Sequence, residues 1–245
     1  MMPQQFTEIW VYLSATPLLG LTITLLAYQA AYWLYKRSDF NPLLNPVALS
    51  VAVLVMLLLT SGTKYETYFE GAKFVHFLLG PATVALAIPL YSQFEKLKQM
   101  LLPLLGALLA GAATAIISAV GIGWLLGASH VTLMSLAPKS VTTPIAMGIA
   151  EKLGGIPSLT AVLVIFTGIS GAIMAKSILD VLRIENHAVR GFSVGVAAHG
   201  IGTARAFQVS EQAGAFAGLA MGLNGLITAL ISPLLLKISG LVLLQ

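Results

Sequence analysis

The sequence has very little charge. Only 9% of its 245 residues are Asp, Glu, Lys or Arg, whereas soluble domains carry roughly a quarter. The absence of cysteine excludes disulfides and thiol chemistry. There is also no Lys/Arg-rich run of the kind that binds nucleic acid. With 58% hydrophobic residues and a mean hydropathy of +0.92, the composition predicts an all-α polytopic protein of the lipid bilayer.

Eight apolar segments follow one another, each near the roughly 20 residues that a membrane helix needs. They fall at about 9–35, 43–61, 74–92, 101–127, 131–150, 157–182, 189–208 and 212–243. The first, fourth, sixth and eighth predict complete helices, and the first is too long for a signal-peptide core, so we expect it to be retained. The fifth and seventh are rich in Pro, Gly, Ser and Thr and predict broken helices. We expect seven or eight transmembrane or re-entrant segments in one integral membrane domain, residues 1–245.

The basic residues bear on the path of the fifth segment. If all eight segments crossed the membrane, Lys and Arg would be nearly balanced between its two sides. If 131–150 instead enters and leaves on one side, Lys176, Arg183 and Arg190 join the basic side and Lys152 leaves it. That arrangement gives a clearer positive-inside bias, so we favour a re-entrant fifth segment.

Two stretches resemble each other and indicate an internal repeat. GPATVALAIPLYSQFEKL (80–97) and APKSVTTPIAMGIAEKL (137–153) share a small residue, a proline, a hydroxyl residue and a valine at the same spacing, and both then reach Glu-Lys-Leu. Chance similarity between short apolar stretches is the alternative. Many transporters are built from repeats whose broken helices meet near the middle of the bilayer. The match makes Pro81 and Pro138 candidate helix-breaking residues.

The segment LAPKSVTTPIA (136–146) places a lysine between two prolines in an apolar run. Pro138 and Pro144 each remove a backbone donor and argue against one continuous helix. Pro138 suits the first turn of a half-helix, whose free N–H groups and positive dipole end attract an anion such as a carboxylate. An ammonium and three hydroxyls would add to that pocket, from Lys139, Ser140, Thr142 and Thr143. The alternative is that the lysine extends to the membrane interface and the hydroxyls bond to helix carbonyls.

The segment GFSVGVAAHGIGTARAF sets a histidine and an arginine among small residues. Gly200 and Gly202 are predicted to break the helix and to allow a ligand to approach the backbone closely. Arg205 could hold a carboxylate with two hydrogen bonds, and His199 could carry a proton near neutral pH. The alternative pairs Arg205 with Glu211 and bonds His199 to a neighbouring backbone group.

The last apolar segment carries Gly214, Gly218 and Gly222 four residues apart. This spacing lets membrane helices pack closely, so we expect structural packing here, and homo-oligomerisation through this row is a further prediction. Asn224 in the same segment is expected to hydrogen-bond across to a neighbouring helix.

The remaining motifs give weak signals. Asp180 is a candidate proton carrier, or it simply pairs with Lys176 one turn earlier. The serine of GISG is too weak a match to a catalytic Ser–His dyad to predict proteolysis. Neither a metal-ligand cluster nor a nucleotide-binding motif occurs in the sequence. We therefore expect no enzyme, no metal and no cofactor.

Several longer stretches together resemble the LrgB/CidB family, including its enterobacterial YohK-type members. They are LAPKSVTTPIAMGIAEKLGGIP, VIFTGISGA, AAHGIGTARAF and GAFAGLAMGLNGLI, and NPLLNPV and LLGPATVALAIPLY fit as well. The resemblance covers nearly the whole chain and implies a multi-pass protein of the bacterial inner membrane, paired with a smaller holin-like LrgA/CidA partner. The residues that match its motifs are Pro138, Lys139, Ser140, Thr142, Thr143, Pro144, His199, Gly202, Thr203 and Arg205.

The resemblance implies two functions. One is antiholin-like modulation of murein hydrolase export and autolysis. The other is transport of small monocarboxylates, because the family is similar to pyruvate-linked bacterial proteins and to part of the plastid glycolate/glycerate transporter. The residues favour transport, because Lys, Arg and Thr on broken helices would offset the cost of desolvating a carboxylate. We expect alternating access, in which 131–150, 189–208 and the matching 74–92 move against the longer helices.

Overall fold

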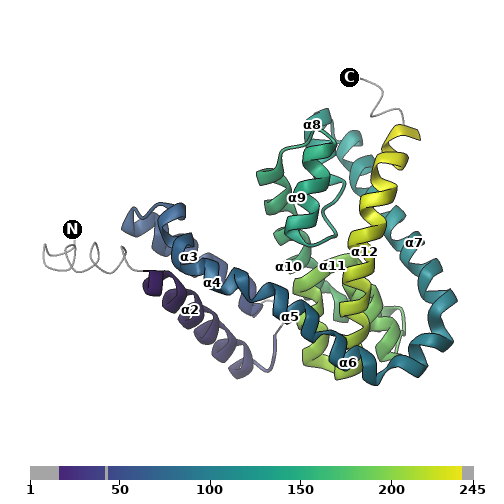
Figure 1. Cartoon of the computed structure of the whole chain (residues 1–245), viewed down its shortest axis with the longest axis horizontal. Helices are drawn as coiled ribbons and strands as arrows, with labels where there is room; N and C mark the ends of the chain where they lie inside the picture. Colours follow the sequence, from purple (N-terminus) through teal and green to yellow (C-terminus); the bar gives the residue numbers. More distant parts are fainter. Residues whose placement is uncertain (1–16, 42–43, 239–245) are drawn as a thin grey trace, which may run out of the picture. The chain divides into compact units, whose positions relative to one another are not determined.

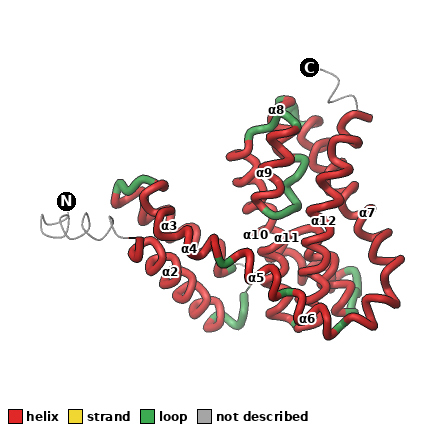
Figure 2. Tube along the Cα trace, in the orientation of Figure 1, coloured by secondary structure: helices red, strands yellow, loops and turns green. Residues whose placement is uncertain are grey.

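The computed structural model describes residues 17–41 and 44–238, and every regular element within these ranges is a helix (Figures 1 and 2). This confirms the predicted all-α class. The chain forms two compact units, Met1–Ala85 and Leu86–Gln245. The start of the first predicted segment and the end of the eighth lie outside the described residues.

The smaller unit holds α2 (Pro17–Arg37), α3 (Pro46–Ser61), α4 (Tyr65–Phe77) and α5 (Leu79–Ala85). A Cβ on Gly20 of α2 would lie 2.5 Å from the Tyr68 carbonyl oxygen, so α2 and α4 pack with their backbones almost in contact. The Thr24 and Tyr68 hydroxyls hydrogen-bond across the same contact at 2.7 Å. Pro81 lies in the first turn of α5, where its missing N–H breaks no helical bond.

The larger unit holds α6 (Ala87–Ser92), α7 (Phe94–Leu125), α8 (His130–Leu136), α9 (Thr143–Lys152), α10 (Pro157–Val181), α11 (His187–Val209) and α12 (Glu211–Ile238). Among the described residues, four helices are long and apolar enough to cross a membrane: Leu18–Arg37, Phe94–Leu125, Pro157–Val181 and Glu211–Lys237. They fall in the four segments predicted to be complete helices. The total of seven or eight segments and the internal repeat stay predictions.

The fifth predicted segment is a helical hairpin. The chain leaves the helical path at residues 137–142, between α8 and α9 (Figure 2). It then returns to α8, because the Ile156 N–H donates to the Ser135 hydroxyl at 2.8 Å and the Thr160 hydroxyl donates to the Ser135 carbonyl at 3.0 Å. We call residues 130–156 the first hairpin and residues 137–142 its tip.

The seventh predicted segment, α11, is also folded back on itself. Its backbone leaves the helical region at Ala198 (φ −126°, ψ 16°) and His199 (φ 41°, ψ −134°). A Cβ on Gly202 would lie 3.0 Å from the Val194 carbonyl oxygen, whereas eight residues of a continuous helix span about 12 Å. We call α11 the second hairpin and residues 198–199 its tip. The break precedes Gly200, and both predicted helix breakers, Gly200 and Gly202, lie in the returning helix.

The two hairpins enter the larger unit from opposite ends, because α10 links the end of the first to the start of the second. The first half of α10 bonds to the first hairpin through Thr160. Its second half contacts the second hairpin, since a Cβ on Gly171 would lie 2.6 Å from the Cβ of Ala198. In Figure 1, α8 and α9 occupy the upper half of this unit and α11 the lower half, with α12 running beside both.

A close contact between backbones joins α11 to α12. A Cβ on Gly191 would lie 2.0 Å from the Ala213 carbonyl oxygen, and one on Gly195 would lie 2.2 Å from the Ala217 carbonyl oxygen. The contact moves from Gly191 to Gly195 on one helix as it moves from Ala213 to Ala217 on the other. The first arm of the second hairpin therefore runs parallel to α12. Small residues at four-residue spacing permit this approach.

The predicted glycine row of α12 has other neighbours. Gly214 packs against the Phe207 ring and Gly218 meets Leu86. A Cβ on Gly222 would meet no described atom within 4 Å. The close helix contact therefore depends on the glycines of α11, and the predicted oligomer contact at Gly222 stays a prediction.

Gly195→Ala should lower the free energy of unfolding by about 1–3 kcal/mol, because the new methyl group would force α11 and α12 apart. Gly222→Ala is the matched control. It should leave stability unchanged or raise it by up to about 1 kcal/mol, since alanine favours a helix. Thermal unfolding in detergent measures both, and equal stabilities would contradict the close contact.

Candidate functional site

Asn224 of α12 ties the two hairpins together, at the first tip and just before the second. Its side-chain amide donates to the Ser140 carbonyl at 3.2 Å and to the Val196 carbonyl at 3.0 Å. The side chain is fully buried, and buried carbonyls without a donor are costly. The predicted hydrogen bond across the helix is confirmed, and it joins both hairpins at one point.

His199 anchors the second tip to α10. Its Nε2 lies 2.9 Å from the Val164 carbonyl oxygen, and because a carbonyl only accepts, Nε2 carries the proton. Gly168 makes room for the ring, since a Cβ there would lie 2.6 Å from the histidine Cε1. The Thr203 hydroxyl donates to the His199 carbonyl at 2.8 Å. His199 thus makes the bond to a backbone group that was the alternative to a proton carrier.

A positive φ at a residue other than glycine carries strain of about 1–3 kcal/mol. His199 has a φ of 41°. Its bond to Val164 and its burial fix the ring in place and so hold the strained backbone. The second tip is therefore rigidly positioned.

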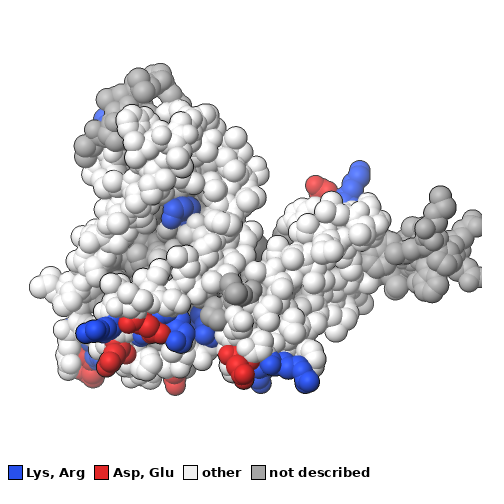
Figure 3. Space-filling view, turned by 180° about the vertical axis from the view of Figure 1, so that it is seen from behind, with Lys and Arg blue, Asp and Glu red and all other residues white. Residues whose placement is uncertain are grey.

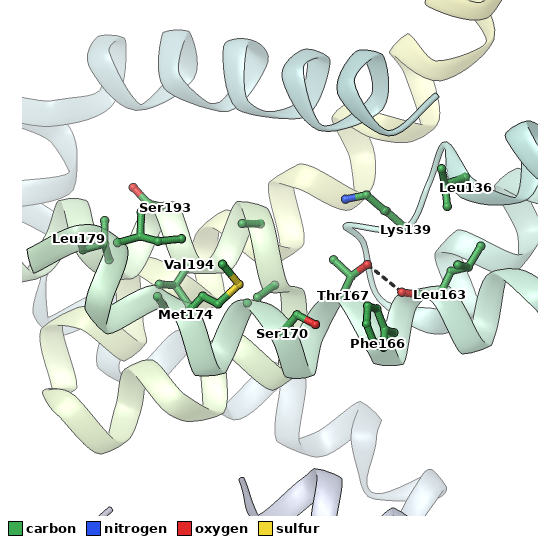
Figure 4. Close-up of a pocket in the computed structure, with 15 residues that line it drawn as sticks. Leu136, Lys139, Leu163, Phe166, Thr167, Ser170, Met174, Leu179, Ser193 and Val194 are labelled. Atoms are coloured by element: carbon green, nitrogen blue, oxygen red, sulfur yellow. Dashed lines mark hydrogen bonds between the residues drawn. The ribbon is translucent and has the colours of Figure 1, made fainter. Parts of the chain in front are cut away.

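Lys139 on the first tip lines a cavity of about 570 Å³ (Figure 4). Its ammonium lies 3.3 Å from the Ser140 hydroxyl. Lys139 is the only Lys, Arg, Asp or Glu among the residues that line this cavity. Figure 4 shows Lys139 and Leu136 at one end of the cavity and Leu179 and Ser193 at the other.

Apart from Lys139 and Leu136 of α8, the cavity wall comes from α10 and α11 and is mostly apolar. The polar side chains that line it, other than Lys139, are Thr167, Ser170 and Ser193. The Thr167 hydroxyl donates to the Leu163 carbonyl at 2.7 Å, and the Ser193 hydroxyl donates to the Val189 carbonyl at 2.8 Å (the former drawn in Figure 4). Both hydroxyls are thus occupied within their own helices, and the ammonium dominates the electrostatics of the cavity. Nothing in the sequence pattern of α10 or α11 distinguishes these hydroxyl residues from ordinary helix positions.

The other hydroxyl residues predicted for this site are not among the residues that line the cavity. Ser140 is buried, and Thr142 and Thr143 are half-buried at the start of α9. The half-helix begins at Thr143 with Pro144 in its first turn, whereas Pro138 lies in the tip. Pro138 was expected to begin this helix and does not, because the chain reverses direction over the four residues after it and α9 begins only at Thr143.

Arg205 lines a separate cavity of about 130 Å³ together with Lys176 and Arg190. Its Nη1 donates to the Gln208 side chain at 3.0 Å. Asp180 pairs with Lys176 at 2.7 Å, which was the alternative to a proton carrier, and also with Arg190 at 2.8 Å. The structure therefore separates Arg205 from Lys139, although the sequence placed them in one site.

The model of the LrgB-like family matches residues 24–238. The chain belongs to the LrgB-like family. Two relatives from Bacillus subtilis, YxaC and YwbG, are each 38% identical to it, over 86% and 90% of this chain and 92% and 97% of their own. The antiholin-like protein LrgB of Bacillus cereus (strain B4264) is 30% identical, over 92% of this chain and 98% of its own. No solved structure matches.

Membership of the LrgB-like family agrees with the four long apolar helices and indicates a membrane protein. In this LrgB-like protein the motif residues of both broken segments gather at the two tips, except Arg205. They do so because each motif contains the point at which its hairpin reverses.

Asn224→Leu should lower the free energy of unfolding by about 2–4 kcal/mol, because it leaves the Ser140 and Val196 carbonyls buried without their donor. Thr228→Val is the control, since its hydroxyl donates only a long bond of 3.4 Å to the Asn224 carbonyl oxygen. That variant should lose less than about 1 kcal/mol. Unfolding in detergent checks both, and equal losses would show that the tips do not depend on Asn224.

Proposed function

We propose that this LrgB-like protein transports small monocarboxylates, such as pyruvate or glycolate, across the bacterial inner membrane as a multi-pass protein. The observation that carries the proposal is the Lys139 ammonium, held on a hairpin tip and lining a largely apolar cavity. A carboxylate that enters the membrane loses hydration, and a positive charge near the middle of the bilayer offsets that cost. The cavity supplies that charge between largely apolar walls.

The opposed hairpins support alternating access. Each hairpin reaches from one end of the larger unit to the level of Asn224, which binds both hairpins. Moving one hairpin while the other stays bonded would open Lys139 to one side at a time. The cavity is built from the larger unit alone, so this mechanism rests on the two hairpins and does not need the 74–92 segment.

The distribution of charged residues supports one orientation of the larger unit in the membrane. Figure 3 shows most of the charged side chains on this face of the larger unit at one end. The basic residues at the end that holds the base of the second hairpin are Lys96, Lys98, Lys176, Arg183, Arg190 and Arg205. The positive-inside rule assigns this end to the cytoplasm. The first hairpin would then be re-entrant from outside and the second from the cytoplasm.

Antiholin-like modulation of murein hydrolase export and autolysis is the second candidate function. The observation that favours it is the name of the Bacillus cereus relative, an antiholin-like protein that is 30% identical to this chain. A holin-like LrgA/CidA partner and a homo-oligomer are compatible with either function. A lysis assay separates the two functions, because a modulator that acts only through its partner has no use for the Lys139 ammonium.

Purified protein in liposomes should take up labelled pyruvate or glycolate, and Lys139→Met should reduce that uptake at least about 30-fold. The reason is that removing one partner of a desolvated charge pair costs about 2 kcal/mol or more. Uptake is measured with and without the LrgA/CidA partner.

Lys152→Met is the matched control for that experiment. Lys152 lies exposed in the last turn of α9, in the same hairpin but away from the cavity, so uptake should stay within about twofold, as for most surface substitutions. Equal uptake by wild type and Lys139→Met would refute the assigned site. A lysis phenotype that survives Lys139→Met, without uptake by the wild type, would favour the modulator.

Single cysteines should report the two hairpin directions, since the chain has no cysteine of its own. Ser129→Cys and Ser158→Cys should both react with a membrane-impermeant maleimide from the outside. Glu185→Cys and Glu211→Cys should both react from the cytoplasmic side. Labelling of Ser129→Cys and Ser158→Cys from different sides would mean that the first hairpin crosses the membrane.

A further inference from the structure

The cavity around Arg205 brings three cations together from three helical segments. Lys176 comes from α10, Arg190 from the first arm of the second hairpin and Arg205 from its returning arm. Like charges gathered in this way repel one another unless a negative charge lies among them. Asp180 provides one carboxylate, which binds Lys176 and Arg190. The described residues that line the cavity thus include three cations and no acid, and Asp180 lies beside the lining.

Arg190 is held in a fixed position in this cavity. Its Nη1 donates to the Ile184 carbonyl at 2.8 Å and pairs with Asp180 at 2.8 Å, and its side chain is only 18% exposed. A guanidinium that is already oriented loses little entropy when it binds an anion. The cavity volume of about 130 Å³ suits an anion of a few heavy atoms.

The small cavity adjoins the large cavity of Lys139. Ala175, Leu179 and Val194 line both. These shared residues include Leu179, which lies at the opposite end of the large cavity from Lys139 (Figure 4). The two cavities thus lie next to each other, with these three residues as a shared wall between the basic end of the unit and the cavity of Lys139.

We propose that the Lys176–Arg190–Arg205 cavity is a second, outer anion site, where a small carboxylate binds before it moves past Ala175, Leu179 and Val194 to Lys139. This inference rests on the proposed transport function and adds a second binding site to the transport pathway. The outer site lies at the base of the second hairpin, and the Lys139 site lies at its tip. With two binding sites, the carboxylate can move from one group of cations to the next, which shortens the apolar distance that it crosses without a positive charge nearby.

Cysteine protection tests the outer site directly. Val209 is half exposed and lines only the small cavity, so Val209→Cys places a unique thiol there. We would measure its reaction with a negatively charged methanethiosulfonate in potassium pyruvate and in potassium chloride of equal ionic strength. Saturating pyruvate should slow labelling at least about fivefold, because the bound anion occupies the cavity and repels the sulfonate.

Further variants in the Val209→Cys protein separate the two sites. Protection should persist with Lys139→Met, which removes the inner ammonium. It should be lost with Arg205→Gln and with Lys176→Gln. It should remain with Arg183→Gln, the matched control, which removes a cation from an exposed position outside the cavity. Both Arg205→Gln and Lys176→Gln should still unfold at the wild-type temperature, so that lost protection reports binding.

The uptake of pyruvate by the same variants completes the test. Arg205→Gln should raise KM about tenfold and leave the maximal rate within about twofold, since it removes an encounter site and not the inner ammonium. Absent protection in the Val209→Cys parent, or its loss with Lys139→Met, would overturn the outer site even if transport is intact. Protection without any uptake would overturn the transport function while supporting the anion site.

Discussion

Two hydrogen bonds from one buried amide hold the larger unit in its arrangement. Each hairpin tip interrupts a helix and so leaves carbonyls without their usual partners, which is costly in an apolar environment. The Asn224 amide binds the Ser140 carbonyl in the first tip and the Val196 carbonyl just before the second tip. The same pair of bonds sets the distance between the tips, and therefore the position of Lys139 beside its cavity.

Particular residues explain how much of this could be predicted from the sequence. The long apolar runs predicted the four candidate spanning helices, and Pro138 and Pro144 predicted the break in the first hairpin, because composition and proline chemistry act locally. The break at His199 was expected one residue later, at Gly200. A histidine holds a positive φ there only because Val164, 35 residues away, accepts its Nε2–H and Gly168 leaves space for its ring. Such a distant contact leaves no local signal.

Which charged residues come together depends on the direction that the chain takes after the break in α11. The spacing of apolar residues does not encode that direction. The sequence could not show that α11 folds back, so Arg205 was expected beside Lys139. The returning arm instead carries Arg205 to the base of the hairpin, next to Arg190. The Gly191 and Gly195 contacts with α12 allow this course, because only a parallel first arm brings Ala213 and Ala217 against them.

The order of synthesis gives the Asn224 bonds a further significance. Ser140 and Asn224 are separated by 84 residues, which a ribosome adds in roughly 4–17 s at its usual rate of about 5–20 residues per second. During that interval the first tip is already synthesised, but α12, whose Asn224 binds the Ser140 carbonyl, is not. We expect water or the insertion machinery to solvate Lys139 and the Ser140 carbonyl until α12 arrives. The packing of α12 is therefore the assembly step that completes the hydrogen bonds of a polar centre synthesised earlier.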